Sequence, residues 1–543
     1  MADLLFRDSA TGWKMASRFL LVILAAAVLA GCASLPPGSG FPKTASWALA
    51  RPEETRFGRQ FGDEARGHDG NSGFRLLAAG VDGFLTRVQM ANAAERTLDL
   101  QYFIFRADDT GQLLSEAVLR AADRGVRVRV LVDDGETLEG DEQLVALDAH
   151  PQIEVRIFNP FAYRGHSELR RDLEFMFNGS RLDYRMHNKL MVVDNAIALI
   201  GGRNVGDQYF QIDPQAQVAD DDVFAAGPIV KGLSGTFDEF WNCAIAIPVR
   251  AFGREMTSDA ALAAYRKVLS DHRQDLKVDG AQYASRVATG EPLAGMISGR
   301  LPLVWAHAQL VYDSPEKKLV DKGAMVGRLM HRPVAKAVAA VQSELLMITP
   351  YFIPGGEGMD LFAELRKRNV RVRVLTNSLE TANVLVAQSG YNHYRRPLLQ
   401  EGVELYELRS LVGNARGSGE TTKMTRYGNY SLHAKLFVLD RQRLFIGSMN
   451  FDQRSMHLNT EIGLIIDSPA LAQQTAARFA SMVSASNSYE LALLPGDRGG
   501  SSHLVWRTRE NGKVVEYDSE PARSGGQRLK VKLLSFLPLD DEL

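Results

Sequence analysis

The sequence has little cysteine: among its 543 residues, only Cys32 and Cys243 carry a thiol. Two thiols are too few for a disulfide framework or a thiolate metal site. A net charge is also lacking, because 63 Lys and Arg residues face 65 Asp and Glu residues. This balance excludes a global basic surface for nucleic acid, although a local basic groove remains open. With 45% hydrophobic and 24% charged residues, collagen-like, low-complexity and disordered chains are excluded.

Cofactor signatures are absent as well. The sequence has no Walker-type loop, no dinucleotide-binding glycine pattern, and no cluster of His, Cys and Glu at metal-ligand spacing. We therefore expect neither a metal ion nor a cofactor.

The amino-terminal region contains an apolar run from Phe19 to Ala30, preceded by Lys14 and Arg18 and followed by Gly31 and Cys32. The run has twelve residues. A helix of that length cannot span about 30 Å of hydrocarbon, so the run is typical of a secretory signal and not of a permanent transmembrane anchor. A core helix with a buried cysteine is the structural alternative.

The Ala-Gly-Cys ending resembles the lipobox of bacterial lipoproteins, in which the cysteine sulfur receives a diacylglycerol before cleavage. The resemblance implies a lipid anchor on Cys32 and a place in the bacterial cell envelope, on the periplasmic side. Ala33 and Ser34 follow without an Asp, which in that family favours the outer membrane. Cys243, beside Trp241, is then the single free thiol, and we expect it to pack as a small apolar residue.

The rest of the chain repeats itself in outline. The segment Arg127-Val-Arg-Val-Leu131 recurs as Arg371-Val-Arg-Val-Leu375, displaced by 244 residues. Each copy follows an apolar segment and an amphipathic segment, and each precedes a further apolar segment, 153–158 or 403–408. Strand, helix, strand is the βαβ pattern, so each half is predicted to be an α/β lobe around a largely buried sheet.

These repeats predict a division of the chain into six parts. The parts are a signal peptide 1–31, a tether and lead-in 32–75, a first lobe 76–250, an inter-lobe segment 251–320, a second lobe 321–495 and a carboxy-terminal extension 496–543. In the extension, residues 528–543 first alternate basic and apolar side chains. An edge strand is the favoured interpretation of that stretch, and a membrane-surface segment is the alternative.

A third repeated segment carries the candidate chemistry. Both copies have the spacing His-x-Lys-x4-Asp and, beyond the Asp, a small residue and an Asn. The first copy consists of His187, Lys189, Asp194, Gly202 and Asn204, and the second, 246 residues later and without a gap, of His433, Lys435, Asp440, Ser448 and Asn450.

Each His and Lys pair precedes an apolar run, 190–193 or 436–439, which places the motif at the start of a buried strand. Side chains two apart on a strand share a face, and an imidazole beside an ammonium group suits a phosphate. The small residue allows close backbone approach, and the Asn amides and the Ser448 hydroxyl can donate to oxygen. A single pair of this kind is more often an exposed polar pair, but two ungapped copies in matching places indicate a site.

These residues resemble the phospholipase D superfamily, which is defined by the paired HxKxxxxD motif, and within it the bacterial C-type cardiolipin synthases. The phrase Ile446-Gly-Ser-Met-Asn-Phe-Asp-Gln-Arg-Ser455 supports the second likeness. The resemblance implies an α/β fold of two similar phospholipase D-type lobes, each a mixed β-sheet flanked by helices. Pseudo-twofold symmetry would relate the lobes and place the active site at their interface.

One histidine from each lobe suits phosphodiester chemistry, because the nucleophile and the acid that protonates the leaving oxygen approach phosphorus from opposite sides. The resemblance implies His187 as the nucleophile and His433 as the general acid and then base. The motif lysines and asparagines would hold the phosphate oxygens.

Each histidine is expected to have a carboxylate on its other ring nitrogen. The resemblance nominates Glu461 in the second lobe and Asp222 in the first. For the preceding pair, Asp220 and Asp221, a solvated turn is the alternative interpretation. The motif residues Asp194 and Asp440 belong to the catalytic signature, but we expect them to organise the lobe interface and not to transfer protons.

The resemblance implies an enzyme, a phosphatidyltransferase that forms cardiolipin from phosphatidylglycerol and a second phospholipid through a phosphohistidine. Its expected partners are membrane phospholipids, and nucleic acid is not expected. Hydrolysis of phospholipid headgroups, a periplasmic nuclease of the same superfamily and a catalytically silent scaffold remain alternatives. Water or an alcohol can resolve the intermediate, and the sequence alone does not choose between them.

Overall fold

A computed structural model describes residues 36–135, 141–212, 217–252, 259–279, 290–410, 430–496, 502–510 and 512–536. Cys32 and the predicted signal peptide lie outside the described residues. Among the helices that are described, none combines the length and the apolar character needed to cross a membrane.

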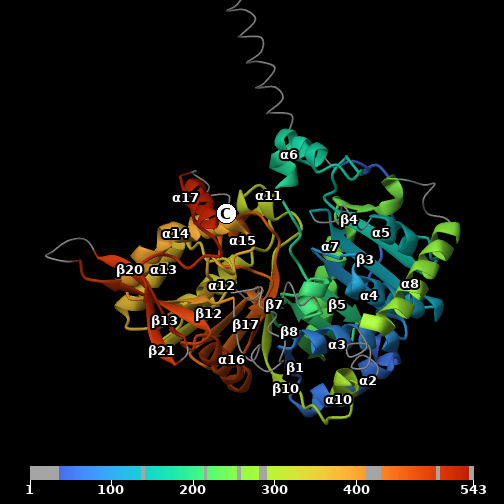
Figure 1. The fold of residues 1–543 in the computed structure, drawn as a ribbon. Coiled ribbons are helices and arrows are strands. Elements are labelled where there is room, and N and C mark those ends of the chain that lie inside the picture. Colours follow the sequence, from blue (N-terminus) through green and yellow to red (C-terminus); the bar gives the residue numbers. More distant parts are fainter. Residues whose placement is uncertain are drawn as a thin grey trace, which may run out of the picture.

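The first lobe is built on a nine-stranded mixed sheet with the strand order β10-β1-β8-β6-β5-β2-β3-β4-β9 (Figure 1). Strands β2, β3 and β4 run parallel, and their other neighbours run antiparallel. The bounds are β1 (Ser72–Leu77), β2 (Thr97–Tyr102), β3 (Arg127–Asp133), β4 (Ile153–Phe158), β5 (Leu190–Val193), β6 (Ile197–Gly201), β8 (Asp222–Ala226), β9 (Ala246–Pro248) and β10 (Val304–Ala306).

The second lobe is built on a ten-stranded mixed sheet with the order β11-β18-β17-β16-β12-β13-β14-β19-β20-β21. Strands β12, β13 and β14 are its parallel members. The bounds are β11 (Ala308–Tyr312), β12 (Glu344–Ile348), β13 (Arg371–Asn377), β14 (Glu404–Leu408), β16 (Leu436–Leu439), β17 (Arg443–Gly447), β18 (Ile462–Ile466), β19 (Ser488–Leu494), β20 (His503–Glu510) and β21 (Lys513–Tyr517).

The two sheets share one strand order. The run β8-β6-β5-β2-β3-β4-β9 of the first sheet matches β18-β17-β16-β12-β13-β14-β19 of the second, position by position. The prediction of two similar α/β lobes is therefore confirmed. The inter-lobe segment gives one strand to each sheet, β10 to the first and β11 to the second, and the carboxy-terminal extension adds β20 and β21.

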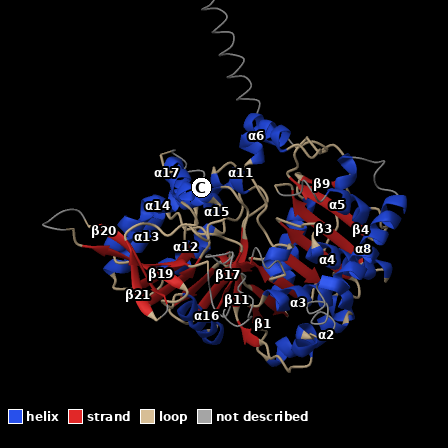
Figure 2. Cartoon of the chain, viewed as in Figure 1, coloured by secondary structure: helices blue, strands red, loops and turns tan. Residues whose placement is uncertain are grey.

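Helices flank both sheets (Figure 2). Those of the first lobe and the inter-lobe segment are α2 (Arg56–Gly67), α3 (Gly80–Ala93), α4 (Asp109–Asp123), α5 (Asp141–Asp148), α6 (Glu168–Leu182), α7 (Ile229–Asn242), α8 (Asp259–Asp279), α10 (Pro292–Ile297) and α11 (Lys317–Asp321). Those of the second lobe are α12 (His331–Ala339), α13 (Gly355–Lys367), α14 (Leu385–Gln400), α15 (Gln453–His457), α16 (Pro469–Met482) and α17 (Gly525–Leu534).

Three buried apolar layers hold these elements together. One lies on the outer face of each sheet, under the flanking helices. The third joins the lobes: Leu190 and Ile200 of the first sheet pack in the same cluster as Leu436 and Ile446 of the second, together with helices α7 and α16. Cys243 lies in this middle layer, as predicted. The central strands of each sheet are thus buried on both faces, which explains their continuous apolar runs.

The favoured interpretation of residues 528–543 as an edge strand is wrong for the part that the structure describes. Residues 525–534 form helix α17, and residues 537–543 lie outside the described residues. The Ser524 hydroxyl accepts a hydrogen bond from Gln527 N at 3.1 Å, which caps the helix. Leu, Lys, Gln and Arg are good helix formers, and this local preference outweighs the short alternation of apolar and basic residues.

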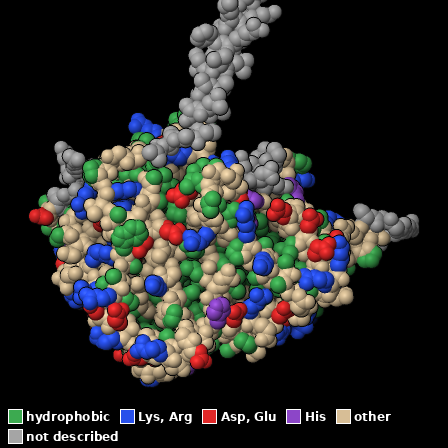
Figure 3. Space-filling view, turned by 180° about the vertical axis from the view of Figure 1, so that it is seen from behind, with side chains coloured by type: hydrophobic (Ala, Val, Ile, Leu, Met, Phe, Trp, Pro, Cys, Tyr) green, Lys and Arg blue, Asp and Glu red, His purple; other side chains and the backbone are tan. Residues whose placement is uncertain are grey.

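The surface has no dominant charge on the face seen from behind. Basic and acidic side chains are interspersed there (Figure 3), as the balanced composition predicts.

Candidate active site

Both histidine motifs begin where the parallel strands of their sheet end. Strand β5 runs antiparallel to β2, so Leu190 at its start pairs with Gln101 near the end of β2. In the second lobe Leu436, at the start of β16, pairs with Ile348 at the end of β12. The His and Lys residues just before these strands therefore lie at the edge where the carboxyl ends of the parallel strands meet.

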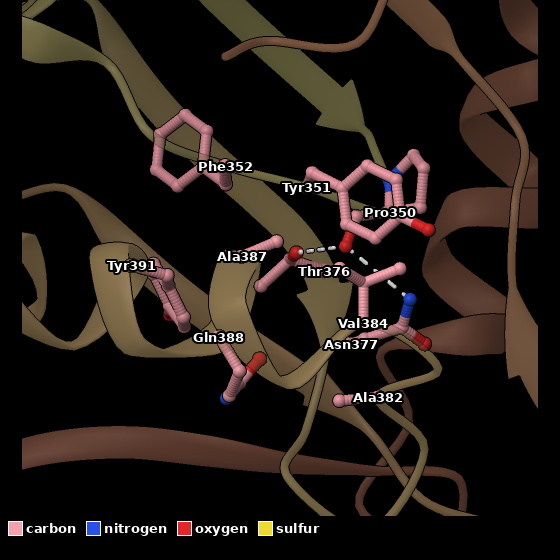
Figure 4. A pocket seen from close by; sticks show the side chains of 10 residues that line it. All are labelled: Pro350, Tyr351, Phe352, Thr376, Asn377, Ala382, Val384, Ala387, Gln388 and Tyr391. Atoms are coloured by element: carbon pink, nitrogen blue, oxygen red, sulfur yellow. Dashed lines mark hydrogen bonds between the residues drawn. The ribbon is translucent and has the colours of Figure 1, made fainter. Parts of the chain in front are cut away.

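A polar side chain at the end of the next parallel strand fixes the residue before each histidine. Asp133 Oδ2 accepts a hydrogen bond from Met186 N at 2.7 Å, and Asn377 Oδ1 accepts one from Leu432 N at 2.8 Å. Figure 4 shows this corner of the second lobe, where the Asn377 amide also donates to the carbonyl oxygen of Pro350 at 3.2 Å. The two contacts occupy equivalent places in the two lobes.

The lobes exchange backbone hydrogen bonds directly beside the histidines. Strand β7 (Gln217–Ala219) of the first lobe pairs in parallel with β15 (Tyr430–Leu432) of the second, and His433 N donates to Ala219 O at 2.8 Å. On the other side of the interface, His187 N donates to Thr460 O at 3.0 Å. Each histidine is thus bound to a backbone segment of the opposite lobe.

These crossed segments each deliver a carboxylate to a histidine. Glu461 of the second lobe places both carboxylate oxygens 3.0 Å from His187 Nδ1. Asp220 of the first lobe places Oδ2 2.6 Å from His433 Nδ1. With Nδ1 held, Nε2 of each imidazole is the nitrogen left for chemistry.

The nomination of Asp222 as a histidine partner is wrong, and so is the interpretation of Asp220 and Asp221 as a solvated turn. All three aspartates are buried. Asp222 accepts hydrogen bonds from Arg87 at 2.8 Å and from Arg203 at 3.1 Å. Strand register explains the error. Asp222 lies opposite Gly201 and Gly463 lies opposite Gly447, so the residue equivalent to Glu461 is Asp220.

The small residue of each motif supports the carboxylate of its own lobe. At Gly202 an added Cβ would lie 2.1 Å from Asp220 Oδ1, so a side chain there would displace the carboxylate. The Ser448 hydroxyl donates to Glu461 Oε2, and Ser455 Oγ donates to Glu461 Oε1 at 2.9 Å. The structure therefore gives Gly202 and Ser448 the task of positioning a carboxylate.

Two buried lysines add positive charge to the site. Lys189 Nζ donates to His187 O at 2.5 Å and lies 5.3 Å from the ring centre of Phe103. Lys435 Nζ donates to His433 O and lies 3.0 Å from His433 Nδ1. Burial lowers the pKa of Lys435 to about 8. Burial, and the nearby charge of Lys435, also lower the pKa of Lys189 well below its usual range. An entering phosphate would relieve this repulsion.

The histidines are neutral at pH 7, while their two carboxylate partners differ from each other in pKa. Burial, reinforced by Lys189 and Lys435, lowers the pKa of His187 well below its usual range, and burial and Lys435 lower the pKa of His433 to about 3. Burial raises the pKa of Glu461 to about 7. Burial alone would also raise the pKa of Asp220, but His433, Lys435 and Arg203 hold it below its usual range, so this carboxylate stays ionised.

The asparagines of the two motifs have different surroundings. Asn204 Oδ1 accepts a hydrogen bond from Ile104 N at 3.2 Å. Asn450 is buried, and its Oδ1 has no hydrogen-bond partner in the part of the chain that the structure describes. Within that same part, no group of three or more His, Cys, Asp and Glu residues is placed to hold a metal ion.

A family profile with the description "Cardiolipin synthase, PLD-like domain" matches residues 88–241 and 335–483, once in each lobe. These ranges cover more than half of the chain. The chain belongs to this family. The sequence-based assignment to the phospholipase D superfamily, and to an enzyme of that superfamily, is confirmed.

Similarity to individual proteins agrees with this family assignment. The chain is 36% identical over 479 residues to cardiolipin synthase C of Escherichia coli (strain K12), a match that covers 87% of this chain and 96% of that protein. It is 26% identical over 410 residues to cardiolipin synthase A of Pseudomonas entomophila (strain L48), covering 74% and 67%. The crystal structure of phosphatidylserine synthase from Haemophilus influenzae Rd KW20 matches with a TM-score of 0.51 and 11% identity, over 79% of this chain and 91% of that one. This last likeness supports the fold alone.

The motif aspartates of this cardiolipin synthase family member lie away from the histidines. Asp194, at the far end of β5 from His187, accepts hydrogen bonds from the backbone N–H groups of residues 95–97 at 2.8 to 3.0 Å. Asp440 binds the N–H groups of residues 342–344 in the same way. Both adopt a φ of 54°, in the left-handed region, at the turn into the next strand. Each thus fixes a turn within its own lobe, and the expectation that they organise the lobe interface is wrong.

Sequence reasoning missed several residues of the site. Asp220 is the clearest case, and Asp133 and Asn377 are the others that hold the motif in place. Two aromatic rings also meet the histidines edge to face: Phe103 lies 5.2 Å from His187, and Tyr209 lies 5.3 Å from His433, between ring centres. Asp133 and Asn377 each end a strand that precedes the motif, and this position could have suggested them. No local sequence pattern marks Tyr209.

Proposed function

We propose that this protein is a phosphatidyltransferase that forms cardiolipin from phosphatidylglycerol and a second phospholipid through a phosphohistidine intermediate. The observation that carries the proposal is the crossed pair of His-carboxylate contacts, His187 with Glu461 and His433 with Asp220. It supplies two imidazoles, each with Nδ1 occupied, beside two buried lysines. The names of the relatives, cardiolipin synthases C and A, support the choice of lipid substrates.

In the first step, Nε2 of neutral His187 attacks phosphorus, the bond from nitrogen to phosphorus forms, and the bond from phosphorus to the leaving oxygen breaks. His433, which takes up a proton on Nε2 from solvent when the phosphate anion binds, gives that proton to the leaving oxygen. The nearby phosphate anion raises the proton affinity of His433, and ionised Asp220 stabilises its protonated form. In the second step, neutral His433 takes the proton of the incoming hydroxyl, whose oxygen displaces His187.

The two carboxylates differ in ionisation, and this difference supports His187 as the nucleophile and His433 as the acid and then base. An ionised partner stabilises an imidazolium, which suits the histidine that carries a proton in each step, and Asp220 stays ionised. Glu461, with its pKa raised to about 7, stabilises a positive charge on His187 less and leaves that imidazole neutral for attack. The lysines and Asn450 would contact the non-bridging oxygens as their charge develops.

The test supplies purified protein with labelled phosphatidylglycerol, with and without phosphatidylethanolamine, and separates the products. Cardiolipin as the main labelled product supports the proposal. Phosphatidic acid as the only labelled product would show hydrolysis and not transfer. Turnover of oligonucleotides but not of phospholipid would reject lipid chemistry. His187→Ala should abolish turnover, whereas His503→Ala, at an exposed position of β20, should not.

We also propose that Cys32 carries a lipid anchor on the periplasmic side of the cell envelope, in the outer membrane. The support is the signal-like run 19–30 and the Ala-Gly-Cys ending. Mass spectrometry of the mature amino terminus tests it: an acylated Cys32 as the first residue is the expected result. A mature chain that begins elsewhere would overturn it.

A further inference from the structure

Helix α6 exposes a row of large apolar side chains. Leu169 is 68% exposed, Met176 70% and Phe177 81%, and Leu173 between them is 42% exposed. Their spacing of three and four residues places them on one face of the helix. Single exposed apolar residues are common on protein surfaces, but a contiguous row of this size marks an interaction site.

Helix α17 repeats this pattern in the second lobe. Leu529 is 58% exposed and Leu533 59%, one turn apart, and Phe536 just beyond is 76% exposed. Arg528, Lys530 and Lys532 flank them, and the helix contains no acidic residue. An apolar row bordered by basic side chains is the pattern of a helix that lies in the interface of a membrane.

A third exposed apolar segment follows helix α11. After α11, Met325 is 45% exposed and Val326 is fully exposed. Helix α11 adjoins α6, because Lys318 Nζ donates to Ser180 O. Figure 1 shows α6, α11 and α17 at the same end of the molecule, at the top of the view. We call the exposed apolar residues of these three segments the apical surface.

The apical surface is connected to the active site through helix α6. Helix α6 ends at Leu182, five residues before His187. Asn159 Nδ2 donates to Arg181 O at the end of the helix, and Asp183 forms a salt bridge of 2.6 Å with Arg454 of the second lobe. A molecule lying on α6 is therefore in contact with a helix whose end lies five residues from His187 and is held against both lobes.

The amino-terminal chain approaches the same region. Its first described part packs on the first lobe: a Cβ at Gly38 would lie 2.9 Å from Ile247 and 3.5 Å from Phe252. Arg164, shortly before α6, stacks over Phe252 at 5.1 Å. Cys32 precedes the first described residue, Pro36, by four residues, which span at most about 14 Å when extended. An acyl group on Cys32 would thus enter a bilayer near α6.

We propose that the apical surface docks onto an anionic phospholipid bilayer, with Met176 and Phe177 inserted among the lipids and the basic residues of α17 at the headgroups. This proposal deepens the proposed function, on which its assignment of the bilayer as a source of substrate rests. The short stretch of chain between Cys32 and Pro36 and the basic border of α17 favour a lipid surface over a second copy of the chain. The bilayer then lies against helix α6, which ends five residues before His187.

The full, detergent-purified chain is reconstituted into vesicles of phosphatidylglycerol and phosphatidylethanolamine that contain brominated acyl chains. Phe177→Trp is compared with the parent chain and with Val514→Trp, because Val514 on β21 is 69% exposed but lies outside the apical surface. Bromine quenches only a nearby indole. The proposal predicts added quenching for the Trp at position 177 and none for the Trp at position 514. Equal quenching at both positions, or none at position 177, would overturn it.

Turnover gives a second, independent measurement. The double variant Met176→Asp with Phe177→Asp should lower turnover on vesicles by about tenfold or more, because two inserted side chains are lost, and should retain turnover on phospholipid in detergent micelles. Val514→Asp should change neither. If the parent turns over no phospholipid while the quenching result holds, the proposed function fails and the docking surface stands. If sedimentation shows a dimer that the double variant loses, without quenching in the parent, the apical surface joins two copies and the proposal is rejected.

Discussion

Glu461 of the second lobe lies 3.0 Å from Nδ1 of His187 of the first lobe, through both of its carboxylate oxygens. The matching contact, from Asp220 to His433, crosses the interface in the opposite direction. Neither lobe therefore contains a complete histidine and carboxylate pair. The requirement for both lobes follows from this crossing, in addition to the need for two histidines.

Replacement of Glu461 by Gln tests the importance of this contact. The amide keeps the size of the side chain but cannot stabilise a positive imidazole, so turnover should fall by roughly two to four orders of magnitude. Steady-state turnover on phosphatidylglycerol measures the effect. Glu490→Gln, at an exposed position of β19, should retain activity. A Glu461→Gln enzyme with parental turnover would contradict a role for the carboxylate.

Asp220 and Asp222 offer a matched pair, because they lie two residues apart and differ in partner. Asp220→Asn should abolish most turnover in a protein that still folds, since His433 loses its ionised partner. Asp222→Asn weakens the carboxylate contact of the buried Arg87 guanidinium, and should lower the free energy of unfolding by about 3 kcal/mol. Turnover and denaturant unfolding separate the two effects. A stable, inactive Asp222→Asn variant would restore the sequence-based assignment.

Gly202 and Ser448 occupy the same place in the two motifs but should respond differently to exchange. Gly202→Ser puts a Cβ 2.1 Å from Asp220 Oδ1, so the carboxylate must leave His433 and turnover should be lost. Ser448→Gly removes one of two hydroxyl donors to Glu461, while Ser455 still donates to that carboxylate. Its turnover should fall far less. Equal losses in the two variants would show that the small residue contacts substrate and does not position a carboxylate.

Asp194→Ala should affect stability more than chemistry. The substitution leaves the N–H groups of residues 95–97 without their carboxylate acceptor, which should lower the free energy of unfolding by about 3 kcal/mol. Measured on the folded fraction, kcat should stay close to that of the parent. A large fall in kcat with unchanged unfolding would give Asp194 a direct role in the reaction.

The sequence predicted the parts of this site that local patterns control. The apolar runs 190–193 and 436–439 form strands, and the paired spacing places the histidines and lysines at the edge of each sheet. The resemblance nominated Glu461 but not Asp220. The sequence did not indicate that each carboxylate contacts the histidine of the opposite lobe, because the partners lie far apart in the chain: Glu461 lies 274 residues from His187, and Asp220 lies 213 from His433.

The equivalence of Asp220 and Glu461 could not be recognised from the sequence, because the loops before them differ in length. From the small residue to the carboxylate the chain runs 18 residues in the first lobe, Gly202 to Asp220, but 13 in the second, Ser448 to Glu461. Only the strand register aligns them. Helix α17 was missed for a different reason, since a short alternation of basic and apolar residues fits a strand and a helix almost equally well.

The raised pKa of Glu461 predicts a pH-dependent stability. Burial raises it to about 7 in the folded protein, against an ordinary value of 4.5, so between these values the folded state binds more protons than the unfolded state. The free energy of unfolding contributed by this group therefore falls as pH rises from about 4.5 to 7, by up to about 3 kcal/mol. Glu461→Gln removes the titration without removing the side chain. Urea unfolding of both proteins at pH 4.5, 6 and 8 measures it. The parent should lose stability relative to the variant across that range, and a constant difference would place the pKa of Glu461 near its ordinary value.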